Sequence, residues 1–158
     1  MVTSGDHFMS IENSIVIDAS KEKIWDILTD VKNWKQWDNE IKFSGIRGPF
    51  SEGTKGTLIS IDEVQRNFRI TSIKQYTEYC NEYTYPCLTK LKFTRRIEPN
   101  GTTCKVIFAA DFTGLLGWYF TGKENRAINK IMQNALENLK QICQRAGSNT
   151  TNHNDNNN

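Results

Sequence analysis

Apolar and polar residues alternate at the start of this chain and then change to a helical spacing. The alternation over residues 11–17 predicts a strand. After Ser20, a good N-cap, apolar residues recur every three to four positions, which predicts an amphipathic helix. Residues 30–38 then predict a short second helix or helical turn. Its Trp34 and Trp37 share a face because they are three positions apart.

The middle of the chain predicts a run of antiparallel strands, each with one apolar and one polar face. Pro99-Asn100-Gly101 is a strong turn signal between the last two strands. A polar turn is predicted over residues 65–67, and Pro86 favours an edge or a bulge over a central ladder. The predicted strands cover residues 41–48, 57–64, 68–79, 81–87, 90–97 and 104–112.

A long amphipathic helix is predicted at the end of the ordered chain, over residues 124–146, with Gly147 as its C-cap. A helix of about 20 residues covers about 30 Å, enough to cross a whole antiparallel sheet. Its apolar stripe steps by four and three positions through Ile128, Met132, Ala135, Leu139, Ile142 and Ala146.

The composition predicts one ordinary soluble domain. A chain of 158 residues suits a single domain, and its 37% of hydrophobic residues suffices for a core. We expect a flexible lead over residues 1–10, the domain over 11–146 and a disordered Asn-rich tail over 147–158. The formal net charge is only +2, and basic residues are mixed with acidic ones, which disfavours nucleic acid as a partner.

Targeting and metal signals are missing from the sequence. No apolar run is long enough for a spanning helix, and residues 1–10 do not look like a secretory signal, so we expect a cytoplasmic protein without an integral membrane segment. The four cysteines form no C-x-x-C pair and are expected to be reduced. Only His7 and His153 are present, at the two ends, so no metal site, cofactor or histidine-based catalysis is expected.

The order of elements and several short motifs resemble the polyketide cyclase/dehydrase and lipid-transport superfamily, also called START-like or Bet v 1-like. The motifs are the segment from Ile15 to Trp37, the turn at residues 52–56, Asn100-Gly101-Thr102-Thr103, residues 111–118 and helix segment 132–140. Together they cover about residues 9–145. The resemblance implies an α+β helix-grip fold. In this fold a curved antiparallel sheet of six to seven strands wraps around a long C-terminal helix, and two short helices follow the first strand.

In such a fold, ligands lie between the sheet and the long helix, so apolar side chains on these faces are candidates for a binding site. Arg95 is the sharpest candidate, because a buried guanidinium needs partners. It could fix the anionic end of a ligand, or it could simply pair with an acid such as Asp111. Trp118 is a candidate gate where the long helix begins. The predicted ligand-binding residues are Trp37, Tyr76, Phe93, Arg95, Phe108, Phe112, Trp118, Ile128 and Met132.

Three functions stay open at this point. The leading one is the binding, transport or sensing of a hydrophobic or amphipathic small molecule such as a lipid, polyketide or aromatic compound. The second is a cyclase, dehydratase or hydrolase in the same cavity, which a carboxyl group of raised pKa beside Arg95 or a tyrosine would favour. The third is a protein-interaction module resembling a chaperone activator, with a collapsed cavity and an apolar patch around residues 118–120. The oligomeric state is not predicted.

Overall fold

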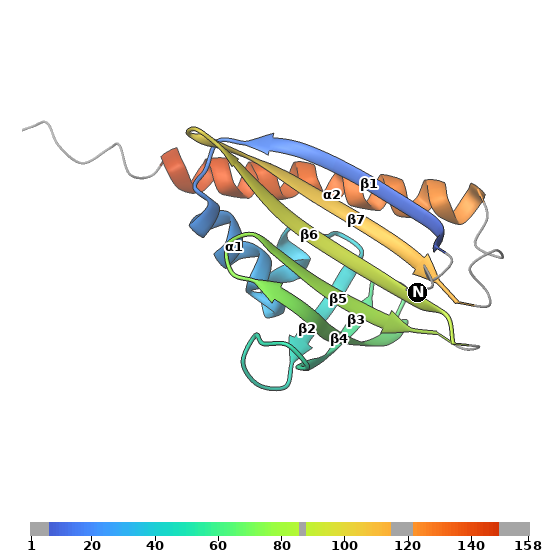
Figure 1. The fold of residues 1–158 in the computed structure, drawn as a ribbon. Coiled ribbons are helices and arrows are strands. Elements are labelled where there is room, and N and C mark those ends of the chain that lie inside the picture. The colour runs from blue at the N-terminus through green and yellow to red at the C-terminus, as the bar shows by residue number, and fades with distance from the viewer. Residues whose placement is uncertain (1–6, 86–87, 115–121, 149–158) are drawn as a thin grey trace, which may run out of the picture.

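In the computed structural model, which describes residues 7–85, 88–114 and 122–148, a strongly curved sheet holds a long helix in its hollow (Figure 1). The seven strands are all antiparallel and lie in the order β1-β7-β6-β5-β4-β3-β2. The predicted helix-grip arrangement is therefore confirmed. In chain order, the elements are β1 (His7–Ile17), α1 (Lys21–Thr29), the 3₁₀ helix η1 (Val31–Gln36), β2 (Ile41–Ile46), β3 (Lys55–Ser60), β4 (Gln65–Lys74), β5 (Glu78–Thr84), β6 (Lys90–Asn100), β7 (Thr103–Thr113) and α2 (Gly122–Ser148).

The two short helices follow from local capping and side-chain spacing. The hydroxyl of Ser20 accepts a hydrogen bond from the backbone N–H of Lys23 at 3.3 Å and caps α1, as its sequence predicts. The rings of Trp34 and Trp37 lie 6.1 Å apart, and both are fully buried. The indole N–H of Trp34 donates to the carbonyl of Leu28 at 2.8 Å, which fixes η1 against the end of α1.

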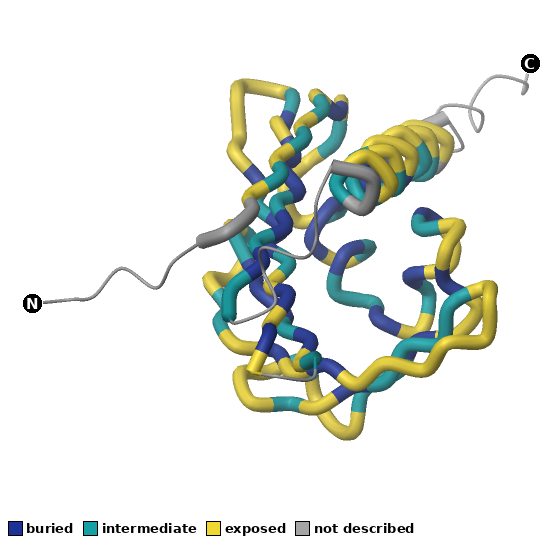
Figure 2. Tube along the Cα trace, turned by 90° about the vertical axis from the view of Figure 1, so that its right-hand side faces the viewer, coloured by how far each residue is buried: buried dark blue, intermediate teal, exposed yellow. Residues whose placement is uncertain are grey.

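Helix α2 closes the open side of the curved sheet. It packs mainly on β1 and more lightly on β7. Figure 2 shows the buried positions of sheet and helix turned toward each other and the exposed positions on the outside. The predicted stripe is confirmed by the burial of Met132, Ala135 and Leu139. The helix continues to Ser148, so Gly147 lies within it and is not the predicted C-cap.

Two strand boundaries differ from the sequence prediction. Residues 65–67 do not form a turn, because they pair with residues 57–59 as the start of β4, and the turn falls on residues 61–64. Strand β4 ends at Lys74, and the turn to β5 contains Tyr76. A β-bulge between Ile70 and Ser72 interrupts the alternation that predicted one long strand over residues 68–79. Strand β1 also begins at His7, before the predicted start at residue 11.

The hairpin of β6 and β7 was predicted closely. Gly101 occupies the turn with φ of +63°, a conformation that favours glycine. Leu91, Arg95 and Ile97 are buried on the inner face of β6, whereas Lys90 and Lys92 are exposed on the outer face. The inner faces of β6 and β7 therefore supply much of the wall opposite α2.

Candidate functional site

A cavity of about 370 Å³ lies between the sheet and α2, and we call it the central cavity. Its volume is at the lower end of the range of small-molecule sites, about 300–1,000 Å³. Seven of the nine predicted ligand-binding residues line it, namely Trp37, Phe93, Arg95, Phe108, Phe112, Ile128 and Met132. Most of the predicted residues thus lie in the wall of the cavity, because the strand and helix spacing places them on the inner faces of the sheet and of α2.

Of the other two predicted residues, the structure describes only Tyr76, and Tyr76 does not line the central cavity. Tyr76 lies in the turn between β4 and β5, where its ring packs edge-on against Trp25 with 6.0 Å between centroids. The bulge in β4 breaks the alternation that placed Tyr76 on the inner face. Trp118, like its neighbours Tyr119 and Phe120, lies outside the described residues.

Several lining residues lie outside the list of nine predicted ligand-binding residues. Trp34 lines the cavity beside Trp37, and Tyr83 lines it as well. Tyr83 belongs to the inner face of β5, and its burial in the sheet raises its pKa above the usual value. Tyr79, deeper in the core, donates to the carbonyl of Leu28 at 2.9 Å, and burial raises its pKa to about 12. Both phenols therefore stay protonated near neutral pH and act as hydrogen-bond donors, Tyr79 to the Leu28 carbonyl.

Arg95 lies in the wall of the central cavity with only 7% of its surface exposed. Its terminal nitrogen Nη1 donates to the side-chain oxygen of Asn81 at 2.7 Å, across the β5–β6 pair. The alternative of a pair with Asp111 is wrong: in the register of the sheet Arg95 faces Phe108 and Asp111 faces Lys92. Within the described parts of the chain, Arg95 makes no ion pair with a carboxylate.

Aromatic rings surround the guanidinium of Arg95. The distances from its Cζ atom to the ring centroids lie between 5.2 and 5.5 Å, which is within the range of cation–π attraction. This attraction offsets part of the cost of burying the charge. The five rings belong to Trp34, Trp37, Tyr79, Phe93 and Phe108.

Asp38 is a titratable group of the central cavity that sequence reasoning did not identify. It is half-buried in the wall directly after Trp37, and its Oδ1 accepts a hydrogen bond from the backbone N–H of Glu40 at 3.0 Å. Burial raises its pKa above 3.8, although the Glu40 N–H and the charge of Arg95 both oppose the rise. Its place at the end of η1, next to a buried tryptophan, was the available signal.

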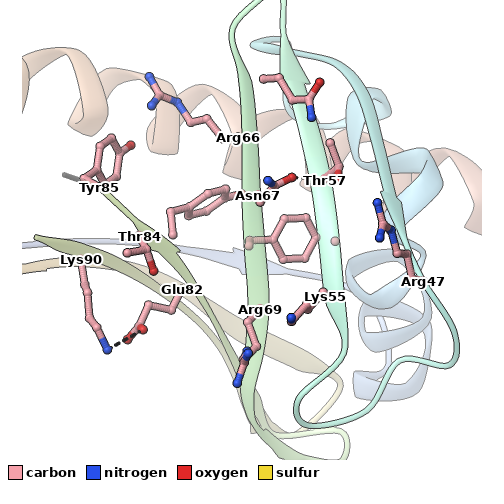
Figure 3. Close-up of a pocket in the computed structure, with 14 residues that line it drawn as sticks. Arg47, Lys55, Thr57, Arg66, Asn67, Arg69, Glu82, Thr84, Tyr85 and Lys90 are labelled. Atoms are coloured by element: carbon pink, nitrogen blue, oxygen red, sulfur yellow. Dashed lines mark hydrogen bonds and ion pairs between the residues drawn. The ribbon is translucent and has the colours of Figure 1, made fainter. Parts of the chain in front are cut away.

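A second, larger hollow of about 790 Å³ lies on the sheet beside the central cavity, and we call it the outer groove (Figure 3). Polar and charged side chains dominate its lining, and the ion pair between Lys90 and Glu82 spans 3.0 Å. Arg66, Tyr83 and Tyr85 line both hollows, so the two adjoin each other. The basic residues of the outer groove are Arg47, Lys55, Arg66, Arg69 and Lys90.

Three cysteines, Cys80, Cys104 and Cys143, are free and buried, whereas Cys87 lies outside the described residues. Burial raises the pKa of Cys143 to about 11, which makes its thiol unreactive. Over residues 7–85, 88–114 and 122–148, no three His, Cys, Asp or Glu side chains gather as a metal site. None of the described helices is both long and apolar enough to cross a membrane.

The model of one protein family, described as polyketide cyclase/dehydrase and lipid transport, matches residues 9–144. No curated protein sequence matches this chain significantly. A START superfamily protein of Mycobacterium smegmatis has a similar structure, with a TM-score of 0.67 and 17% identity over 87% of this chain and 98% of that one.

Two further solved structures are similar over most of this chain. The Aha1 dimer of Colwellia psychrerythraea gives a TM-score of 0.63 and 20% identity, covering 85% of this chain and 96% of that one. The di-domain ARO/CYC protein BexL of the BE-7585A biosynthetic pathway gives 0.66 and 16%, covering 84% of this chain and 45% of that one. At these identities the likenesses establish the fold and leave the three candidate functions open.

Proposed function

Since the chain belongs to the polyketide cyclase/dehydrase and lipid-transport family, we propose that it carries or senses an amphipathic small molecule, such as a lipid, polyketide or aromatic compound, in the central cavity. Family and fold point to a hydrophobic ligand-binding protein. The free, buried thiols also suit a reducing compartment, and so support a cytoplasmic carrier.

The single observation that carries this proposal is the open volume of about 370 Å³ behind a mostly apolar wall. Ile128, Met132 and Phe112 offer apolar surface to a ligand from helix and sheet. Removal of such surface from water contributes about 25 cal/mol per Å² to binding. A protein-interaction module with a collapsed cavity would not keep this volume open.

Filling the central cavity is expected to abolish binding. Ala135 lines the cavity from α2, whereas its neighbour Asn134 is exposed. Ala135→Phe places a ring inside the cavity, so its affinity for the neutral fluorescent probe N-phenyl-1-naphthylamine should fall at least about tenfold. Asn134→Phe adds the same ring to the outer face of the same helix and should stay within about twofold of wild type. Fluorescence titration of the three proteins measures these affinities.

Equal affinities in all three proteins would place the probe elsewhere and contradict the proposal. Native mass spectrometry of protein purified from its own source then tests whether a natural ligand stays bound. A discrete added mass that is released on denaturation would identify its chemical class. A clean unliganded mass, together with no probe binding, would instead favour the interaction module.

A second candidate, an enzyme with acid/base chemistry in the same cavity, is favoured by one observation. Asp38 is a cavity carboxyl group whose pKa is raised and whose charge interacts with Arg95. This is the combination expected of an acid/base site. Tyr83 lines the same cavity, and its phenol, which the raised pKa keeps protonated, would donate a hydrogen bond to the substrate.

The raised pKa of Asp38 predicts that Asp38→Asn stabilises the protein near neutral pH. The folded pKa lies above the unfolded value of 3.8, so ionised Asp38 lowers stability at every pH above the folded pKa. The advantage of Asp38→Asn should be largest there, shrink as the pH falls through the folded pKa, and vanish below 3.8. Urea unfolding of both proteins at several pH values measures it. A difference that does not vary with pH would remove the acid/base candidate.

A further inference from the structure

Arg95 is a buried cation that forms no ion pair in the described parts of the chain. Its one hydrogen-bond partner, Asn81, is neutral, and its Nε has no partner among the described residues. A buried charge that lacks a paired anion is costly, and a guanidinium offers five N–H donors. The fold therefore retains an unfavourable group at a position where an apolar residue would pack against the same rings.

Neither Asp38 nor the aromatic rings provide hydrogen-bond acceptors for the unpaired N–H of Arg95. Asp38 is close enough to interact electrostatically with Arg95, but the two side chains form no ion pair. The five ring faces attract the positive charge, yet an aromatic face is not a conventional hydrogen-bond acceptor for its N–H groups. The Nε–H of Arg95 therefore has no acceptor among the described residues.

A second donor without a partner lies on the same wall. The indole Nε1 of Trp37 is buried and has no hydrogen-bond partner among the described residues, and the Trp37 ring centroid lies 5.4 Å from Arg95 Cζ. Both residues line the central cavity. Asn81 lies on the neighbouring strand and fixes one end of the guanidinium, which orients the fork. Unpartnered donors in one place favour an acceptor-rich, anionic group.

We propose that the ligand of the central cavity is an amphipathic anion, with an aromatic or aliphatic body and one carboxylate-like or sulfonate-like group bound by Arg95 and the indole N–H of Trp37. This inference rests on the proposed function and specifies its ligand class. The body of the ligand lies against the apolar wall around Phe112, Ile128 and Met132. The anionic group neutralises the cation inside its ring of aromatic side chains.

Two probes that share one aromatic skeleton distinguish the contribution of the anionic group to affinity from the contribution of apolar contacts. 8-Anilinonaphthalene-1-sulfonate carries one sulfonate, and N-phenyl-1-naphthylamine is the same skeleton without it. In the full chain, Arg95→Met should lower the affinity for the sulfonate at least about tenfold and leave the affinity for the neutral probe within about threefold. Arg95→Lys should recover part of the sulfonate affinity, because it restores the charge without the fork.

The stability of Arg95→Met is the decisive companion measurement. A methionine packs among the same rings without a buried charge, so its melting temperature should equal or exceed that of wild type. A clear fall in melting temperature would show that Arg95 serves packing, and would overturn the proposal. Equal losses for both probes, or no loss for either, would overturn it as well.

Two control variants exclude binding at other basic residues. Arg96→Met removes the neighbouring cation, which is part-exposed and bonded to Glu78 at 2.7 Å. Arg69→Met removes a cation from the outer groove. Both should keep wild-type affinity for the sulfonate, and a tenfold loss in either would show that the anion binds at that residue instead of at Arg95.

If the neutral probe binds wild type and the sulfonate does not, only the anion proposal fails. If neither binds, the proposed function fails too.

Discussion

Replacing Trp34 with alanine is expected to lower the free energy of unfolding by about 3–5 kcal/mol. Its side chain is fully buried, its indole N–H donates to the Leu28 carbonyl at 2.8 Å, and its ring stacks on Phe68 with 5.4 Å between centroids. The substitution leaves a void behind η1 and removes one of the two side-chain donors to the Leu28 carbonyl, which keeps its hydrogen bond from Tyr79. Chemical denaturation of wild type and variant measures the loss.

Trp25→Ala is a matched control that tests whether the effect of Trp34→Ala on probe binding comes from the cavity wall or only from lost stability. It is also buried, but it packs on Phe50, Tyr76 and Tyr79 and does not line the central cavity. Trp25→Ala should lose comparable stability while the folded protein keeps its affinity for N-phenyl-1-naphthylamine. Trp34→Ala should alter that affinity, because it removes part of the wall. A loss of less than about 1 kcal/mol for Trp34→Ala would contradict the packing described for η1.

Gly56→Ala is expected to destabilise the protein by about 1–3 kcal/mol, because the ring of Phe68 lies directly over this glycine. A Cβ at position 56 would come within 2.2 Å of Phe68 Cζ and 2.6 Å of Cε1. Phe68 is buried and stacked on Trp34, so its ring cannot move away without disturbing the wall of the cavity. Thermal and urea unfolding of the variant test this.

A double-mutant cycle identifies the cause of that loss. Phe68→Leu shortens the offending side chain, so Gly56→Ala should cost markedly less in the Phe68→Leu background than in wild type. Gly45→Ala on β2 is the control, because its Cβ would meet Phe43 Cζ at 3.4 Å, an ordinary contact. Simple additivity of the Gly56 and Phe68 substitutions would show that the ring contact is not the reason.

Most of the fold followed from local patterns. Alternation marked the strands and their inner faces, the spacing of Trp34 and Trp37 marked η1, and the long apolar stripe marked α2. The misplaced boundaries have local physical reasons that alternation does not contain. The bulge after Ile70 shifts the faces of β4, and residues 65–67 are polar because this end of β4 is exposed on both faces.

The residues of the candidate site could be predicted only in part from the sequence. Inner-facing positions such as Phe93, Phe108 and Met132 could be assigned from period alone, and they line the cavity. Tyr76 was misassigned because the count of positions continued through a bulge into a turn. Asp38 was missed because nothing near it in the sequence shows that Arg95, 57 positions later, lies close enough to act on its charge.

The sequence by itself determined the order of the elements, the face on which most strand and helix side chains lie and the family to which the chain belongs. Only the tertiary structure decided the volume of the cavity, the partners of Arg95 and the burial of Asp38. Periodicity reports the direction of a side chain relative to its own backbone, which is a local property. The partners and solvation of a side chain depend on the elements that pack around it. These elements can lie far away in the sequence, so local periodicity does not predict which of them will contact the side chain.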